Sequence, residues 1–137
     1  MRKFIIATHR SLARGLADSL EFFTKKGIDV YQINAYMGDN NFPEDKVQEI
    51  MNSFTDDDEV VILTDIVSGS VTQKMYPYIN ERTFLISGVN MPLALSLLLY
   101  PSNTFLSVNK IHKLIKQARE QIVLVNDLNS ANQNDDE

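Results

Sequence analysis

The sequence contains no cysteine and only two histidines, which narrows the chemistry open to it. Without cysteine there are no disulfides, no thiolate catalysis and no cysteine-ligated zinc. The two histidines, His9 and His112, lie far apart in the sequence and leave little for a transition metal. We therefore expect no metal site and no cofactor.

The chain also lacks an excess of positive charge and any long apolar run. Its formal net charge of −5 provides no basic surface for nucleic acid. The segment before His9 is too short for a signal peptide, and no apolar stretch approaches the length that spans a bilayer. A GxxxxGK[ST] loop and a GxGxxG motif are both missing, so ATP or a dinucleotide would lack its usual binding signature. These absences predict a cytoplasmic protein without a nucleic-acid partner.

What the sequence does contain is a regular alternation of strand and helix signals. Short apolar runs predict strands at 4–7, 29–35, 60–63 and 83–86. Helical spacing of apolar residues predicts helices at 12–27, 43–54, 71–78, 91–100 and 107–122. Four βα units with short connections predict a doubly wound α/β fold, with a mainly parallel sheet and helices on both faces. Residues 1–128 form the expected domain, and the polar residues 129–137 are expected to be disordered.

Particular residues are predicted to set the helix ends and the buried faces. Ser11 and Ser107 are candidate N-caps for the first and last helices. The segment 93–100 is apolar on nearly every side and needs cover, either from the core or from another subunit. Residues 122–125 have strand character, which suggests an additional edge strand. The buried stripe of the first helix is predicted to consist of Leu12, Leu16, Leu20 and Phe23.

His9 follows the first apolar strand, and Asp65 follows the strand at 60–63. The carboxyl ends of parallel strands meet at one edge of the sheet, so we expect these side chains to lie close together. A carboxylate that bonds one ring nitrogen fixes the tautomer and leaves the other nitrogen as a nucleophile. Two plainer roles are also open: His9 as a residue that only satisfies loop backbone groups, and Asp65 as a helix cap or turn former.

The triplet Ser68, Gly69 and Ser70 follows Asp65 and precedes a predicted helix. Its hydroxyl and amide groups suit phosphoryl oxygens, although serine and glycine are also common turn residues. Arg10 either attracts phosphate to His9 or points into solvent, and His112 is expected to be solvated. Together the residues favour a phosphate carried on histidine and supplied by another phosphoprotein.

Three short motifs, each after a predicted strand, carry a resemblance to a known family. The first is Ala7-Thr8-His9, and the third is Gly88-Val89-Asn90-Met91-Pro92. The second, Asp65 to Ser70, matches in part an Asp followed by a Gly-Gly-Ser-Pro-like loop. Over residues 1–128 the chain resembles the IIA component of the mannose/fructose/sorbose class of the bacterial phosphoenolpyruvate-dependent sugar phosphotransferase system. The departures from the family pattern are Ser68 for glycine, Val71 for proline and Gln73 for asparagine.

The resemblance implies a phosphotransferase in which His9 accepts phosphate from phospho-HPr. A IIB component then takes the phosphate and phosphorylates a sugar that enters through a membrane IIC/IID complex. By the same resemblance, Asp65 orients His9, and Thr8, Ser68, Gly69 and Ser70 bind the phosphoryl group. It also implies a homodimer that exchanges an antiparallel C-terminal strand, which residues 122–125 would supply. No metal or nucleotide is required.

Two other functions are compatible with the same residues. The phosphocarrier subunit of a dihydroxyacetone kinase shares the fold and the N-terminal histidine, but the run from Gly88 to Pro92 and the Asp65 loop disfavour it. A noncatalytic sensor of phosphorylation state is permitted by the changes between Asp65 and Gln73. A binding module that has only the fold is the plainest alternative. The sequence names neither the sugar nor whether IIB is a separate chain.

Overall fold

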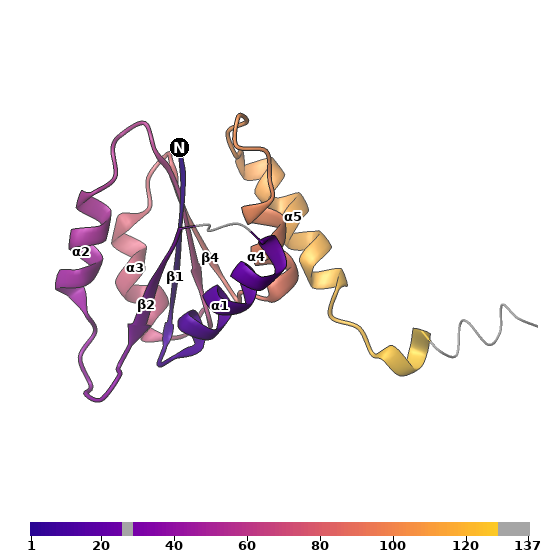
Figure 1. The fold of residues 1–137 in the computed structure, drawn as a ribbon, viewed down its shortest axis with the longest axis horizontal. Coiled ribbons are helices and arrows are strands. Elements are labelled where there is room, and N and C mark those ends of the chain that lie inside the picture. The colour runs from indigo at the N-terminus through magenta and orange to yellow at the C-terminus, as the bar shows by residue number, and fades with distance from the viewer. Residues whose placement is uncertain (26–28, 129–137) are drawn as a thin grey trace, which may run out of the picture.

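Four parallel strands form the centre of the molecule (Figure 1). The computed structural model describes residues 1–25 and 29–128. The strands are β1 (Arg2–His9), β2 (Val30–Ala35), β3 (Glu59–Thr64) and β4 (Thr83–Ser87), in the order β2-β1-β3-β4. Their positions confirm the four predicted strands.

Helices cover both faces of this sheet, which confirms the doubly wound α/β fold (Figure 1). On one face lie α2 (Glu44–Asn52) and α3 (Ser70–Met75), the latter continued by the short helix η1 (Tyr76–Tyr78). On the other lie α1 (Leu12–Thr24), α4 (Met91–Leu98) and α5 (Val108–Glu120). The predicted helix end at Gly27 and the predicted disorder of 129–137 fall outside the described residues.

The central strands are buried on both faces because helices pack against each side of the sheet. Every residue of β3 is buried, as expected for an apolar strand covered from both directions. Along β1, successive side chains alternate between two cores, with Phe4 and Ile6 facing α1 and α4, and Ile5 and Ala7 facing α2 and α3.

The structure corrects the predicted buried face of α1 and decides what covers α4. The buried residues of α1 are Ala13, Ala17 and Leu20, whereas Leu12 and Phe23 are exposed. Because the alanine side chains are small, the helix packs closely against its neighbours. Its buried face therefore includes Ala13 and Ala17, and not Leu12 and Phe23. The apolar α4 packs between α1 and α5. Of the two predicted alternatives, cover from the core and cover from another subunit, the core accounts for most of this helix within a single chain.

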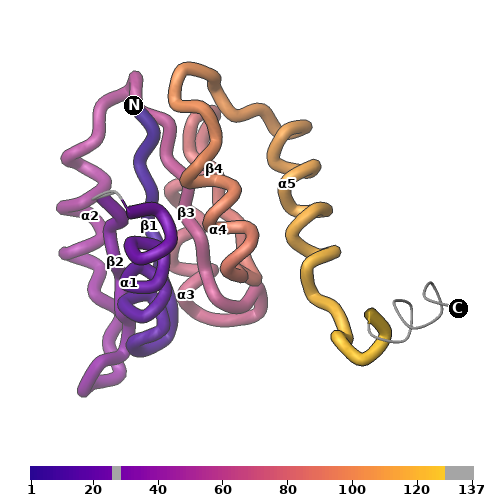
Figure 2. The backbone as a smooth tube through the Cα atoms, turned by 45° about the vertical axis from the view of Figure 1, so that its right-hand side comes forward, coloured from indigo at the N-terminus to yellow at the C-terminus, as the bar shows by residue number. Residues whose placement is uncertain are grey.

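The C-terminal segment does not form a strand in the single chain. Residues 122–124 have no regular structure and 125–128 form one helical turn. Figure 2 shows this segment leading away from the sheet beyond α5. An apolar sequence pattern fits a strand only where another strand is available to pair with it, and within residues 1–25 and 29–128 no strand pairs with this segment. The predicted extra edge strand is therefore wrong for the isolated chain.

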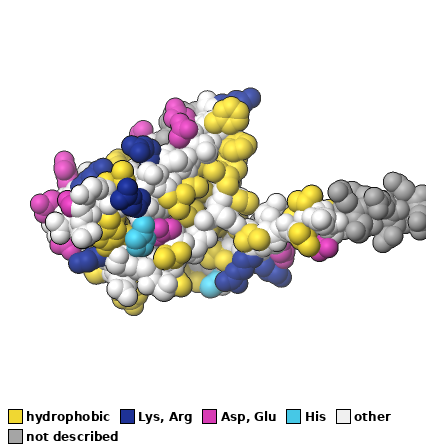
Figure 3. Space-filling view, turned by 90° about the horizontal axis from the view of Figure 1, so that it is seen from below, with side chains coloured by type: hydrophobic (Ala, Val, Ile, Leu, Met, Phe, Trp, Pro, Cys, Tyr) yellow, Lys and Arg dark blue, Asp and Glu magenta, His cyan; other side chains and the backbone are white. Residues whose placement is uncertain are grey.

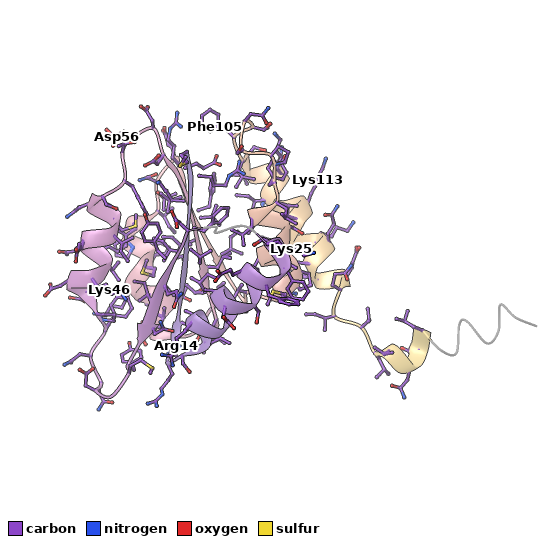
Figure 4. The ribbon with its side chains drawn as sticks, viewed as in Figure 1. Arg14, Lys25, Lys46, Asp56, Phe105 and Lys113 are labelled. Atoms are coloured by element: carbon purple, nitrogen blue, oxygen red, sulfur yellow. The ribbon has the colours of Figure 1, made fainter. Side chains whose placement is uncertain are left out.

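The amino-terminal edge of the sheet is held by a buried ion pair. Arg2 Nε lies 2.7 Å from Glu59 Oε1, and both side chains are 6% exposed. Glu59 Oε2 also accepts a hydrogen bond from the Leu106 amide at 2.7 Å. These contacts connect β1 and β3 to the loop between α4 and α5. Figure 4 shows Asp56 and Phe105 at this edge and Arg14 at the opposite, carboxyl-terminal edge.

Strand order places the topological switch point of the sheet between the carboxyl ends of β1 and β3. The chain leaves β1 toward β2 on one side, and it leaves β3 toward β4 on the other. Neighbouring strands whose connections run in opposite directions form a switch point, where ligands bind in open α/β sheets. His9 is the last residue of β1, and Asp65 directly follows β3, so both lie at this point.

Candidate active site

His9 and Asp65 form a hydrogen-bonded pair at the switch point. His9 Nδ1 lies 2.9 Å from Asp65 Oδ2, and the same oxygen accepts the His9 backbone amide at 2.9 Å. The imidazole is 34% exposed, whereas the carboxylate is 11% exposed. The two side chains therefore lie together, as the sequence predicts. The Asp65 carboxylate is mostly buried, whereas the His9 ring is accessible to another molecule.

The state of the carboxylate determines which ring nitrogen is available. Burial raises the pKa of Asp65, but hydrogen bonds from the His9 amide, the His9 ring and the Ile66 amide together lower it by more. The pKa of Asp65 therefore lies below its usual value of 3.8. Asp65 is therefore ionised at neutral pH and can only accept hydrogen bonds. His9 Nδ1 must then carry the proton. In the neutral ring, Nε2 then keeps its lone pair and is the nitrogen that can act as a nucleophile.

Gly69 fixes the position of the imidazole by allowing close backbone approach. A Cβ at this position would lie 2.7 Å from His9 Cε1 and 2.9 Å from Ile66 Cγ1. Its φ of −85° is ordinary, so the requirement for glycine is one of space. The Gly69 amide donates to the Ile66 carbonyl at 3.3 Å and is already engaged within the turn.

Ser70 is bonded to a residue that the sequence analysis did not single out. Ser70 Oγ lies 2.6 Å from the hydroxyl of Tyr36, which directly follows β2. The Tyr36 ring also lies beside the His9 ring, with 5.6 Å between centroids. The parallel register pairs His9 with Ala35, so the next residue necessarily lies beside the histidine. The proximity of Tyr36 to His9 follows from this strand register, and the register cannot be read from the sequence alone.

Thr8 has a structural role at the start of α1. Its side chain is fully buried, and Oγ1 accepts the Ala13 amide at 2.7 Å. It thereby caps the first turn of α1, whereas Ser11 occupies the N-cap position without a side-chain hydrogen bond. The predicted contact of Thr8 with the phosphoryl group stays a prediction. Ser68 is exposed on the turn that follows Asp65.

Hydroxyl groups beneath the Asp65 loop hold it in place. Thr72 Oγ1, on α3, lies 2.8 Å from Thr64 Oγ1 and donates to the Ile66 carbonyl at 2.7 Å. The Thr64 carbonyl accepts the amides of Gly88 and Val89 at 3.1 and 3.0 Å. Gly88 has φ of +83°, which favours glycine. The third motif thus supports the strand end from which Asp65 projects.

Apolar and basic groups surround the pair at the carboxyl-terminal edge. Seen from below, this face carries a histidine beside hydrophobic, basic and acidic side chains (Figure 3). Arg10 is exposed next to His9. Within residues 1–25 and 29–128, no three His, Cys, Asp or Glu side chains gather to hold a metal ion. The exposed apolar residues at the starts and ends of the neighbouring elements are Leu12, Met37, Ile66 and Val67.

Comparison with known families identifies the chain. The family model for the PTS system fructose IIA component matches residues 3–107. The chain belongs to this family of fructose- and mannose-type IIA components. The match includes all four strands and the loops that carry His9, Asp65 and Gly88. No curated protein sequence matches the chain.

Solved structures share the IIA fold over nearly the whole chain. A Klebsiella pneumoniae protein described as a phosphoenolpyruvate-dependent sugar phosphotransferase system permease is 29% identical, with a TM-score of 0.81 and 91% of each chain covered. A IIA protein associated with the fucose utilization operon of Streptococcus pneumoniae is 21% identical, with a TM-score of 0.76, covering 93% of this chain and 95% of that one. The mannose/sorbose-specific IIA subunit of Enterococcus faecalis is 13% identical, with a TM-score of 0.74 and coverage of 90% and 93%. The last two likenesses concern the fold alone.

Membership in the IIA family implies phosphotransferase activity within a sugar phosphotransferase system. It also implies interaction with HPr and IIB components. Among the described helices, none has the length and apolar character needed to cross a bilayer.

Proposed function

We propose that this IIA protein carries a phosphoryl group on Nε2 of His9. The P–N bond of phospho-HPr breaks as the Nε2–P bond forms, and the donor histidine of HPr regains its lone pair. The Nδ1 proton stays between His9 and Asp65, where the carboxylate stabilises the charge that develops on the ring. A IIB component then removes the group by the reverse chemistry.

The observation that carries this proposal is the double hydrogen bond from His9 to Asp65 Oδ2. It orients the ring, assigns the proton to Nδ1 and leaves Nε2 as the nucleophile on a ring that is one-third exposed. Phosphoryl transfer through a loose transition state depends mainly on positioning and electrostatics, which this arrangement supplies. Ser70, Ser68 and the turn around Gly69 are the groups we propose to contact the phosphoryl oxygens.

The surroundings of His9 suit protein partners better than a small sugar. The ring lies on an open sheet edge bordered by exposed apolar side chains, which can pack against another protein. We propose HPr as donor and a IIB component as acceptor in the cytoplasm. Through IIB, the protein would serve a membrane IIC/IID complex that imports the sugar.

A homodimer is the further part of this proposal. The free edge of β4 borders a groove of about 810 Å³ lined by Phe84, Ile86 and residues of α5. The segment 122–128 carries five exposed apolar side chains: Ile122, Val123, Leu124, Val125 and Leu128. Pairing of this segment from one copy with β4 of another would bury both surfaces and extend the sheet.

The test is phosphorylation by phosphoenolpyruvate, enzyme I and HPr, followed by mass spectrometry. We expect a gain of one phosphate mass that is labile in acid, stable in base, and lost in His9→Ala. The matched control, His112→Ala, should still take one phosphate, because His112 lies on α5. An unmodified wild-type protein, or modification that survives in His9→Ala, would contradict the proposal.

Onward transfer separates the alternatives. The phosphorylated protein should lose its phosphate to a IIB component and should not support dihydroxyacetone phosphorylation with the kinase subunits of that system. Retention of phosphate with every IIB protein would favour a sensor of phosphorylation state. Transfer to the kinase subunits would favour the dihydroxyacetone pathway.

A further inference from the structure

Tyr36 connects the two side chains on which the proposed reaction depends. Its hydroxyl lies 2.6 Å from Ser70 Oγ, and its ring packs beside the His9 imidazole at an interplanar angle of 33°. The three residues come from three separate parts of the chain: Tyr36 directly follows β2, Ser70 is the first residue of α3, and His9 is the last residue of β1. Among the contacts of the described residues, Tyr36 is the side chain that contacts both His9 and Ser70.

The backbone at Tyr36 is unusual for an aromatic residue. Its φ is +63°, in the left-handed region where a Cβ is sterically unfavourable. Asparagine or glycine would adopt this conformation more readily. Because a strained residue persists only where the surrounding structure holds it, the strain points to a role for the side chain it carries.

We propose that Tyr36 is a positioning residue for phosphoryl transfer, which holds the Ser70 hydroxyl in place and forms a wall against the His9 ring. This inference rests on the proposed function of His9. A phenol is a stronger hydrogen-bond donor than an aliphatic hydroxyl, so Tyr36 donates and Ser70 accepts. The Ser70 proton is then free to point toward a phosphoryl oxygen. Tyr36 thus acts through Ser70 and through the position of the His9 ring.

The test is the rate of phosphoryl transfer from phospho-HPr to wild type, Tyr36→Phe, Ser70→Ala and the double variant. Tyr36→Phe keeps the ring beside His9 and removes only the hydroxyl. We expect kcat to fall about 3- to 10-fold, the effect of one neutral hydrogen bond, with KM for phospho-HPr unchanged. In the Ser70→Ala background the same change should have no further effect, because its target is gone.

Tyr31→Phe is the matched control, since Tyr31 lies on β2, the strand that Tyr36 follows, and its ring packs against Phe54 at 5.3 Å. It should transfer at the wild-type rate. Urea unfolding of each variant separates a loss of stability from a loss of positioning. The inference would be overturned if Tyr36→Phe transferred phosphate at the wild-type rate, or if its effect added in full to that of Ser70→Ala. The phosphocarrier function would stand in either case. A wild-type protein that takes no phosphate would overturn both.

Discussion

Asp65 Oδ2 accepts two hydrogen bonds from His9, one from ring Nδ1 and one from the backbone amide, both at 2.9 Å. The carboxylate is therefore tied to the end of β1 as well as to the imidazole. A rotation of the ring about its side-chain bonds would break one bond and leave the other in place. This geometry fixes the orientation of the ring, and with it the direction of Nε2.

Replacement of Asp65 by asparagine should slow phosphorylation of His9. The side chain keeps its size, but the negative charge that assigns the proton to Nδ1 is lost. We expect a loss of about 10- to 100-fold, as seen when the carboxylate that orients a metal-binding histidine is removed. Stopped-flow transfer from phospho-HPr measures it. Asp57→Asn, in the exposed acidic run at the opposite edge, should leave the rate unchanged.

Acid should remove the contribution of Asp65 to stability. Its pKa in the folded protein lies below 3.8, because hydrogen bonds from His9 and Ile66 outweigh the effect of burial. A lowered folded pKa stabilises the protein above the unfolded pKa of about 3.9, and the effect is lost as pH falls through the folded value. The free energy of unfolding of wild type should exceed that of Asp65→Asn at pH 5, and the difference should shrink below about pH 4. Urea titrations at stepped pH measure it, and a difference that grows in acid would contradict it.

Gly69→Ala should displace the imidazole. The new Cβ would lie 2.7 Å from His9 Cε1, so the ring must move away from its bond with Asp65. We expect slower phosphoryl transfer and a loss of roughly 1–3 kcal/mol in stability, as for other overpacked sites. The control is Gly15→Ala on α1, where no atom lies within 4 Å of the added Cβ. It should raise stability by about 0.5–1 kcal/mol, because alanine favours a helix over glycine.

Thr8→Val should destabilise the protein through α1. Valine has nearly the same shape, but it cannot accept the Ala13 amide that Thr8 Oγ1 binds at 2.7 Å. Loss of a helix cap at a buried position should cost about 1–2 kcal/mol in the free energy of unfolding. Ser11→Ala should change it by less than about 0.5 kcal/mol, because the Ser11 side chain makes no cap hydrogen bond. Equal effects of the two variants in urea titrations would contradict this assignment.

The sequence alone determined the α/β architecture and the principal pair. Apolar runs and helical spacing are local properties of the chain, so the four strands and most helices could be recognised without coordinates. His9 and Asp65 could be placed together because every parallel strand brings its carboxyl end to the same edge of the sheet.

Tertiary structure decided everything that depends on distance between segments. The strand register placed Tyr36 beside His9, and burial gave Thr8 a capping role in place of Ser11. Close packing explained Gly69, and residues 122–128 lie outside the four-stranded sheet of the described part of the chain. Such contacts join residues that are far apart in the sequence. The sequence pattern predicts the helices and strands, but not the distances between them in the folded chain.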